Sequence, residues 1–453
     1  MSKPRFKIEQ LPAMPDLLAL QAASPSRYPH LLQSTAVDGQ QGRYDILFAF
    51  PAESLVLDRH WQLSGPHSDA GSFLSALDAW QAELAVEGSD ATTLPFAGGW
   101  FVYLGYELAK EIEPKLQLTP PDDLPIAVAQ RIPAAIIIDQ VDGATYCLAE
   151  EGQEALLDEM RQDVAGAAAF EPCGLDIVGL REEDPARYLA AVKRTIRYII
   201  DGDIFQANLS RLWEAELGKD VRHADIYDRL RKANPGPYNA LATFGAQAIM
   251  SSSPERLVES RRGTVQTRPI AGTRPRGADA DEDAALTREL IGHPKERAEH
   301  IMLIDLERND LGRIAEPGSV EVNELMVLET YAHVHHIVSN VRARLRAGVT
   351  PGETIAATFP GGTITGCPKV RCMEIISELE QGARSAYTGS LGYLNRDGSL
   401  DLNILIRTMI RDERKIRFRA GGGTVFDSIP ENELEETRAK AKGLVRALTG
   451  ETG

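Results

Sequence analysis

Apolar residues recur at helical spacing along much of the chain. One such face is formed by Leu189, Val192, Ile196 and Ile199. The preceding Asp184 suits a helix N-cap and Pro185 suits the first helical position, while Gly202 is a natural end for this helix. The same spacing predicts helices over residues 73–87, 281–291, 295–306, 370–380 and 431–448.

Runs of apolar and β-branched residues predict strands between these helices. The predicted strands span residues 43–50, 95–106, 133–140, 144–149, 238–244, 263–268, 387–394, 400–410 and 415–420. Asp142-Gly143 predicts a hairpin turn between two of them. Runs of strands with helices at their ends favour an α+β fold over a regular alternation of strand and helix.

The stretch from residue 150 to 172 is rich in Ala, Gly and Glu and predicts a helix followed by a linker. We therefore place a sequence boundary near residue 175. It divides the chain into an N-terminal region, 1–175, and a catalytic region, 176–453. We expect the N-terminal region to be intertwined with one large catalytic core.

A glycine-rich turn precedes the helix predicted from Val370. Gly361, Gly362 and Gly366 allow close approach of the backbone to a ligand, and a helix N-terminus attracts anions. Thr363, Thr365 and Lys369 would add hydroxyl donors and a cation at this turn. The pattern predicts a site for a small carboxylate or phosphate, although an ordinary connection before a core helix would read the same way. It is not a P-loop, because the G-x-x-x-x-G-K-[ST] motif is absent.

Composition restricts the partners of this chain. Its 453 residues include 49 basic and 66 acidic ones, and the resulting net charge of −17 repels polyanions. The sequence lacks a Lys/Arg stripe, an apolar signal core and a membrane-length apolar run, so neither nucleic acid nor a membrane is expected as a partner. Cys147, Cys173, Cys367 and Cys372 form no CxxC pair, which fits a reducing cytoplasm.

Several polar groups could carry chemistry. Glu255, in a Ser-Pro-Glu turn after a strand, could be a general acid/base if buried, or a solvated capping group if not. Carboxylates on the helices around residues 295–300 and 433–440 could hold Mg²⁺, which prefers oxygen ligands, but such charge runs are also typical of solvated faces.

In His333-Val-His-His336, strand alternation puts His336 on the opposite face from His333 and His335, which argues against a three-histidine metal site. Gly421-Gly-Gly423 is either a close-approach backbone or a turn.

Read together, these segments resemble the chorismate-utilising enzymes, which include anthranilate, aminodeoxychorismate, isochorismate and salicylate synthases. The resemblance is strong over residues 180–450 and weak before them. Its motifs are Gly202-Asp-Ile-Phe-Gln206, Ser253-Pro-Glu255, Arg268-Pro-Ile-Ala-Gly-Thr273, Asp305-Leu-Glu-Arg-Asn-Asp310, His333-Val-His-His336, Gly361-Gly-Thr-Ile-Thr-Gly-Cys-Pro-Lys369, Ile406-Arg-Thr408 and Glu436-Thr-Arg-Ala-Lys440. The family fold implied is a sandwich of large antiparallel β-sheets with helices outside.

The resemblance also implies a role for each matched residue. Glu299 and Glu436 would ligate Mg²⁺, which grips the ring carboxylate of chorismate. Glu255 would be the acid/base, and His336 would lie where the 4-hydroxyl leaves. The residues implied to hold the rest of the substrate are Gly272, Thr273, Thr365, Tyr387, Arg407, Gly421, Gly422, Gly423 and Lys440.

A few positions bear on which member this chain resembles. Water-using members carry a lysine at the position of Gln206, and because a neutral amide is no general base, ammonia is the implied nucleophile. Gly361-Gly362 and Gly422 resemble aminodeoxychorismate synthase component I. Ala271 departs from that pattern, because many such enzymes have a nucleophilic lysine there, whereas Pro-Ile-Ala-Gly-Thr is the usual anthranilate synthase form. The glycine positions favour the first member, and anthranilate synthase component I stays open as the alternative.

The family also has a tryptophan-binding region in its N-terminal part. It resembles His30-Leu-Leu-Gln-Ser34, Arg43-Tyr-Asp45 and Pro237-Tyr-Asn239. The residues implied to bind tryptophan are Leu32, Ser34, Arg43, Tyr44, Asp45, Pro237, Tyr238 and Asn239. Ordinary core and turn residues would give the same pattern, so both interpretations stay open.

The function expected from the resemblance is conversion of chorismate and ammonia to 4-amino-4-deoxychorismate, for 4-aminobenzoate and folate synthesis. The chain contains no G-x-C-x-G nucleophile turn of a glutaminase. A separate glutamine amidotransferase subunit is therefore the expected source of ammonia.

Overall fold

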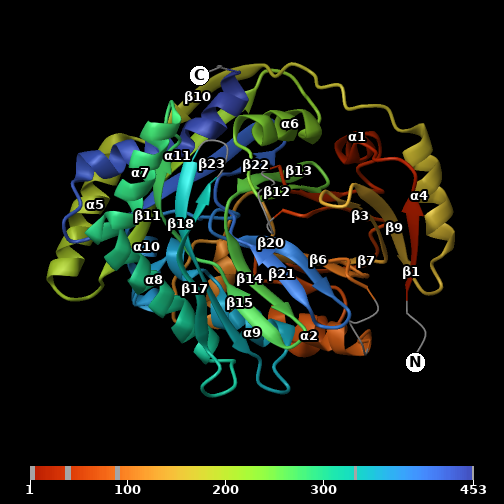
Figure 1. Ribbon diagram of the computed structural model, residues 1–453, viewed down its shortest axis with the longest axis horizontal. Helices are drawn as coiled ribbons and strands as arrows, with labels where there is room; N and C mark the ends of the chain where they lie inside the picture. Colours follow the sequence, from red (N-terminus) through yellow and green to blue (C-terminus); the bar gives the residue numbers. More distant parts are fainter. Residues whose placement is uncertain (1–5, 36–41, 87–91, 331–333, 451–453) are drawn as a thin grey trace.

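The computed structural model describes residues 6–35, 42–86, 92–330 and 334–450, apart from the side chains of Lys295 and Val334. Two large antiparallel sheets form its centre (Figure 1). The first has 12 strands in the order β1 (Phe6–Leu11), β9 (Ala144–Glu150), β8 (Ala134–Asp139), β3 (Tyr44–Ala49), β2 (His30–Gln33), β12 (Tyr238–Phe244), β13 (Gln247–Ser253), β22 (Thr408–Asp412), β23 (Lys415–Thr424), β11 (Gln206–Leu217) and β10 (Ile177–Glu182), with β19 (Gly366–Cys367) paired to β11.

The second sheet has 11 strands and carries the remaining strands of the described chain. Its order is β16 (Ile270–Pro275), β18 (Val334–Arg344), β15 (Thr264–Thr267), β14 (Arg256–Arg261), β21 (Leu400–Asn403), β20 (Ser390–Asn395), β6 (Gly99–Leu104), β7 (Ala127–Ile132), β4 (Ser54–Leu57) and β5 (Leu63–Ser64), with β17 (Glu321–Thr330) paired to β18. The α+β sandwich expected from the sequence is therefore confirmed.

The two sheets pack face to face through a shared apolar core. Phe48 of β3, Ile137 of β8 and Ala240 of β12 meet Phe101 of β6 and Leu391 of β20. Alternation along a strand explains how β6 serves two cores, because successive side chains point to opposite faces. Its buried sequence, GWFVYL, is accordingly apolar throughout.

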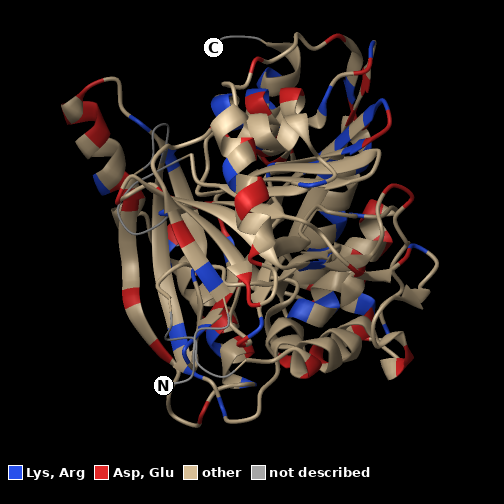
Figure 2. Cartoon of the chain, turned by 90° about the vertical axis from the view of Figure 1, so that its right-hand side faces the viewer, with Lys and Arg blue, Asp and Glu red and all other residues tan. Residues whose placement is uncertain are grey.

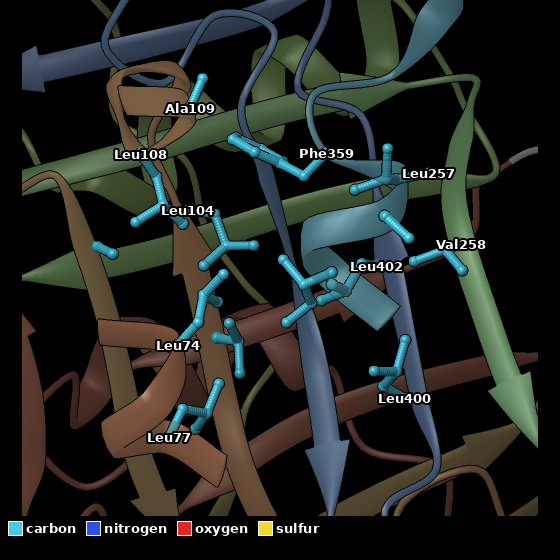
Figure 3. Packing of buried hydrophobic residues seen from close by; sticks show 14 of the residues in the cluster. Leu74, Leu77, Leu104, Leu108, Ala109, Leu257, Val258, Phe359, Leu400 and Leu402 are labelled. Atoms are coloured by element: carbon cyan, nitrogen blue, oxygen red, sulfur yellow. The ribbon is translucent and has the colours of Figure 1, made fainter. Parts of the chain in front are cut away.

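Helices cover the outer faces of the sandwich. The helices on the first sheet, which share one apolar cluster with it, are α1 (Leu17–Ala23), α4 (Ala155–Gly166), α6 (His223–Ala233) and α11 (Pro430–Thr449). Those on the second sheet share another apolar cluster and are α2 (Phe73–Glu83), α8 (Pro294–Gly312) and α9 (Pro351–Thr358), whereas α10 (Lys369–Glu380) packs on β11 of the first sheet. Figure 3 shows part of this second cluster, with Leu74 and Leu77 facing Leu104, and Phe359 near Leu257. The remaining helices are α3 (Ala109–Ile112), α5 (Pro185–Ile200) and α7 (Ala280–Gly292).

Most elements predicted from periodicity are present. The Asp184 carboxylate caps α5 by accepting from the Ala186 N–H at 3.0 Å, and β8 and β9 form the hairpin expected around Asp142-Gly143. The long strand predicted over 400–410 is wrong. It is two strands, β21 and β22, which lie in different sheets and are joined by residues 404–407. The joining residues Ile404, Leu405 and Ile406 are themselves apolar, so the sequence pattern runs on through the crossing and could not reveal it.

The N-terminal region does not form a sheet of its own. β2 pairs with β12, placing Leu32 opposite Ala240, and β6 pairs with β20, placing Val102 opposite Gly392. Each sheet therefore consists of one block of strands from before position 175 and one block from after it, joined by the β2–β12 pair in the first sheet and the β6–β20 pair in the second. No helix in the described ranges combines the length and apolar character needed to cross a bilayer. Acidic and basic residues are interspersed over the outward helices and loops (Figure 2).

Residues 176–453 expressed alone should fail to fold into a stable monomer. Without residues 1–175, β12 would lose β2 and β20 would lose β6, so one edge of each strand would be unpaired and apolar core would be exposed. Solubility and thermal unfolding followed by circular dichroism would test this expectation, with the whole chain as the control. A soluble truncated monomer with a cooperative transition would show instead that the two regions are independent domains.

Candidate active site

A cavity of about 1140 Å³ opens between the two sheets and the helices α8 and α11. Most residues predicted from the sequence to bind or transform a substrate line it. These are Gln206, Glu255, Gly272, Thr273, Glu299, His336, Tyr387, Arg407, Gly421, Gly423, Glu436 and Lys440. They come from segments more than 200 residues apart, so the fold brings them together.

Two sheet-to-sheet crossings lie side by side at this cavity. The first, Ser253 to Arg256, leads from β13 in one sheet to β14 in the other, and the second leads from β21 back to β22. They are tied together by the Ile404 N–H, which donates to the Glu255 carbonyl at 3.0 Å, and by the Ser252 N–H, which donates to the Arg407 carbonyl at 3.1 Å. Each crossing contributes one ionisable side chain to the cavity, Glu255 and Arg407.

Glu255 is buried, with only 5% of its surface exposed. Burial raises the pKa of its carboxyl to about 7, against the opposing effects of the Thr363 hydroxyl and of the charges on Lys440 and Arg407. The Thr363 hydroxyl donates to Glu255 Oε1 at 2.7 Å. A carboxyl that titrates near neutrality and borders a cavity suits general acid–base work.

His336 faces the cavity as a neutral imidazole. Burial and the nearby charge of Arg407 lower its pKa to about 4. Its Nδ1 lies 2.9 Å from the Thr273 hydroxyl, whereas His335 turns to the other side of β18, where its Nε2 lies 2.8 Å from Asp283. The two histidines thus occupy opposite faces as predicted, and His333 lies outside the described residues.

Arg407 provides a cation for an anionic ligand. It lines the cavity, and its guanidinium has no hydrogen-bond or ion-pair partner among the described residues. Its backbone has a φ of 52°, a left-handed conformation that is uncommon outside glycine and often marks functional positions. Burial lowers the pKa of Arg407, because a desolvated charge without a partner is disfavoured. A carboxylate ligand would satisfy this group.

Neutral donors surround the same part of the cavity. Burial raises the pKa of Tyr387 to about 12, so its phenol keeps its proton. Gly421 and Gly423 line the wall, and a Cβ on Gly423 would clash with the amide nitrogen of Gln206. The absence of side chains here exposes backbone to a ligand, in agreement with the sequence interpretation of this segment.

Two predicted substrate residues do not line the cavity. Gly422 faces α11, where a Cβ would lie 3.1 Å from Glu436 Oε1. Thr365 is fully buried, and its hydroxyl donates to the Gly361 carbonyl at 2.8 Å. Thr365 therefore stabilises the glycine-rich turn itself.

Glu299 and Glu436 bring carboxylates to the cavity from two helices, α8 and α11. A Cβ on Gly423 would lie 3.5 Å from Glu299 Oε1, and the Glu436 carboxylate pairs with the Lys440 ammonium at 2.7 Å. No group of three or more His, Cys, Asp or Glu side chains in the described chain could enclose a metal. Two carboxylates nevertheless fit Mg²⁺, which takes one or two protein carboxylates and completes its shell with water and ligand oxygens.

The lysine predicted to bind an anion at the start of α10 is instead bound to other residues of the protein. The Lys369 ammonium contacts Asp310 Oδ2 at 2.5 Å and the Thr358 carbonyl at 3.3 Å. Lys369 does not line the cavity, so its charge is used inside the protein. Of the turn's three polar side chains named above, Thr363 lines the cavity and Thr365 and Lys369 do not. The Thr363 hydroxyl donates to Glu255, which also lines the cavity.

Sequence reasoning missed several residues of the cavity wall. Asn208 follows Gln206 on the same face of β11, Arg419 precedes Gly421 on the same face of β23, and Glu433 lies one turn before Glu436 on α11. Strand and helix periodicity could have suggested all three. The Arg419 guanidinium is already paired with Glu380 at 3.0 Å.

A second cavity, about 890 Å³, contains most of the residues predicted to bind tryptophan. Those lining it are Leu32, Arg43, Tyr44, Pro237, Tyr238 and Asn239. Ser34 and Asp45 do not line it; they are buried nearby, and the Ser34 N–H donates to Asp45 Oδ1 at 2.9 Å. Arg43 pairs with Asp139 at 2.7 Å, so its charge is partly neutralised.

The sequence and the structure of this chain are both similar to those of known proteins. The family model described as chorismate binding enzyme matches residues 33–446. An anthranilate synthase component I-like protein of Synechocystis is 39% identical over 433 residues, which cover 94% of this chain and 85% of that protein. Aminodeoxychorismate synthase component 1 of Bacillus subtilis is 38% identical over 444 residues, covering 93% and 92%. The crystal structure of anthranilate synthase component I from Streptococcus pneumoniae superposes with a TM-score of 0.77 at 31% identity, covering 90% of this chain and 94% of that one.

Lys369→Met should destabilise the protein by about 3–5 kcal/mol, because it leaves Asp310 as an uncompensated buried carboxylate. Denaturant unfolding would measure the loss. Arg344→Met is a matched control, since Arg344 pairs with Glu316 at the surface and its loss should cost less than about 1 kcal/mol. Equal losses in the two variants would contradict an internal role for Lys369.

Proposed function

Because this chain belongs to the chorismate binding enzyme family, and so acts on chorismate, we propose that it is the aminodeoxychorismate synthase component I of its organism. It would convert chorismate and ammonia to 4-amino-4-deoxychorismate and water. The observation that carries the proposal is the meeting, in one cavity, of the near-neutral acid Glu255, the unpartnered Arg407 and the amide Gln206. The first can transfer protons, the second can hold a carboxylate, and the third cannot activate water as a base.

Arg407 would bind the enolpyruvyl carboxylate of chorismate, assisted by the Tyr387 phenol and by the backbone at Gly421 and Gly423. The acidic protein thereby offers a local cation to a dianionic substrate. Bidentate contact between guanidinium and carboxylate fixes orientation as well as affinity. Glu299 and Glu436 would hold Mg²⁺ at the other end, where the ion would orient the ring carboxylate and withdraw charge from the ring.

Glu255 would act as the acid/base beside the ring. Its pKa of about 7 leaves it partly protonated at neutral pH, so it can give a proton to the departing 4-hydroxyl. His336, neutral at this pH and near Thr273, would accept or donate a hydrogen bond at the same oxygen. Breaking the C–O bond releases water, and ammonia forms the new C–N bond and returns a proton.

The choice between the two ammonia-using members depends on a few positions. Gly361, Gly362 and Gly422 support the aminodeoxychorismate assignment. Ala271 supports anthranilate synthase component I as the second candidate, because it lines the cavity and provides no lysine nucleophile there. In the proposed reaction ammonia therefore reacts without a lysine adduct at that position.

Two further components complete the proposal. A separate glutamine amidotransferase subunit would supply ammonia, because the sequence contains no glutaminase nucleophile turn. Tryptophan would bind in the second cavity, where Tyr44, Pro237 and Tyr238 provide apolar contacts and Asn239 a polar one.

The test is product identification by mass spectrometry after incubating the purified chain with chorismate, Mg²⁺ and ammonium. We expect 4-amino-4-deoxychorismate, which keeps the enolpyruvyl group, and we expect no turnover once a chelator has removed Mg²⁺. Restoring Mg²⁺ is the control for damage by the chelator. Fluorescent anthranilate with released pyruvate would assign the second candidate instead, and isochorismate would exclude ammonia as the nucleophile.

A further inference from the structure

A buried arginine, Arg384, lies behind the wall of the active-site cavity. Its surface is 2% exposed, and it does not line the cavity itself. It begins a tight turn that ends at Tyr387, because the Tyr387 N–H donates to the Arg384 carbonyl at 2.9 Å. Glu107 fixes the start of this turn by accepting from the backbone N–H groups of Arg384 and Ser385, at 2.8 and 3.2 Å. The turn therefore couples Arg384 to a residue of the cavity wall.

The Arg384 guanidinium lies over the aromatic ring of Tyr387. Its central carbon is 5.5 Å from the centroid of that ring and 4.9 Å from the centroid of the Tyr106 ring. A planar guanidinium is attracted to the faces of aromatic rings, and this contact restricts how the Tyr387 ring can turn. Tyr387 lines the cavity, and its hydroxyl lies 2.8 Å from the position that a Cβ on Gly421 would occupy.

The same guanidinium holds two other parts of the cavity wall. It donates to the Asn208 carbonyl of β11 at 2.6 Å and to the Ile364 carbonyl of the glycine-rich turn at 3.3 Å. Both residues line the cavity. The side-chain oxygen of Asn208 lies 3.0 Å from the position of a Cβ on Gly421, beside the Tyr387 hydroxyl. The polar groups of Asn208 and Tyr387 therefore meet at Gly421, and one buried cation holds both residues.

Glu380, the last residue of α10, keeps the guanidinium in this orientation. Its carboxylate accepts from Arg384 Nη2 at 2.6 Å and from Arg384 Nε at 3.0 Å. The Thr388 hydroxyl accepts from Nη1 at 3.3 Å. The five N–H groups of Arg384 are therefore matched by five bonds, two to Glu380 and one each to Asn208, Ile364 and Thr388. A lysine has three donors and no planar group, so it could not replace this arrangement.

We propose that Arg384 is a positioning residue for substrate binding. It holds the Tyr387 hydroxyl and the Asn208 amide in the directions in which they bind the enolpyruvyl carboxylate of chorismate together with Arg407. A hydrogen bond weakens steeply when its donor points away from the acceptor, so a Tyr387 ring that is free to turn would bind the carboxylate less tightly. The inference rests on the proposed function, which places the enolpyruvyl carboxylate at Arg407 and Tyr387.

The test compares two ligands by titration calorimetry of the whole chain, with Mg²⁺ and without ammonia. One ligand is chorismate, and the other is the chorismate analogue in which a hydroxyl replaces the enolpyruvyl ether. We expect Arg384→Lys to bind chorismate about 10-fold more weakly than wild type, as for one weakened hydrogen bond to a charged group, and to bind the analogue with unchanged affinity. Unchanged affinity for chorismate would overturn the inference. Equal losses for both ligands would do so too, because they would show a merely structural role.

Arg211→Lys is the matched control. Arg211 is fully buried, pairs with Glu182 at 3.3 Å, donates to the Glu183 carbonyl at 2.6 Å and lies over the Trp213 ring at 5.1 Å, but it does not line the cavity. Thermal unfolding should show similar losses of stability in the two variants, and Arg211→Lys should bind both ligands as wild type does. A selective loss of chorismate affinity in Arg211→Lys would overturn the inference, because lost stability alone would then explain the effect.

If Arg384→Lys does not fold, a crystal structure of the wild type with chorismate and Mg²⁺ decides the question. The inference requires the Tyr387 hydroxyl to lie within hydrogen-bond distance of the enolpyruvyl carboxylate while its ring stays on Arg384. An enolpyruvyl carboxylate bound to Arg407 but away from Tyr387 would overturn the inference and leave the proposed function standing. Failure of the wild type to bind chorismate would refute the proposed function instead.

Discussion

The active site depends on two adjacent segments in which the chain crosses from one sheet to the other. At the crossings between β13 and β14 and between β21 and β22, backbone hydrogen bonds join Glu255 to Ile404 and Ser252 to Arg407. Where the chain crosses between the sheets, the hydrogen-bond ladder of the strand is interrupted. Side chains at such a crossing can therefore point into the space between the two sheets. The cavity exists because both interruptions occur at the same level of the sandwich, and α8 and α11 close it from the outside.

Desolvation then sets the chemistry of the groups that this geometry collects. It raises the pKa of Glu255 and lowers that of His336, giving a partly protonated carboxyl and a neutral imidazole near pH 7. It also disfavours the charge of Arg407, which lacks a protein partner in the described chain. An anionic ligand relieves that cost. Most other buried arginines near the cavity, such as Arg384 and Arg419, are already paired with Glu380, which leaves Arg407 as the natural contact.

The sequence predicted local structure better than the pairing of residues that are far apart in the chain. The α5 helix with its Asp184 cap and the β8–β9 hairpin follow from signals within a few residues, and both are present. The break at residues 404–407 could not be predicted, because the joining residues Ile404, Leu405 and Ile406 are apolar and β-prone and continue the strand pattern. The pairing of β2 with β12 joins residues about 200 positions apart, which no periodicity encodes. The same limit applies to Lys369. Its position beside a glycine-rich turn predicts that it binds an anionic ligand, but its partner is Asp310, which lies 59 residues away in the sequence.

The central claim is that Arg407 is the cation that anchors a carboxylate of chorismate. The most direct measurement is the dissociation constant of chorismate, by titration calorimetry with Mg²⁺ and without ammonia, for wild type and Arg407→Gln. Arg417→Gln is the control, since Arg417 lies on β23 outside the cavity and pairs with Asp122 at 2.6 Å. We predict binding weaker by about 100-fold in Arg407→Gln, as expected for loss of one partner of a buried charge pair, and unchanged binding in Arg417→Gln. Equal affinity for chorismate in wild type and Arg407→Gln would contradict the account.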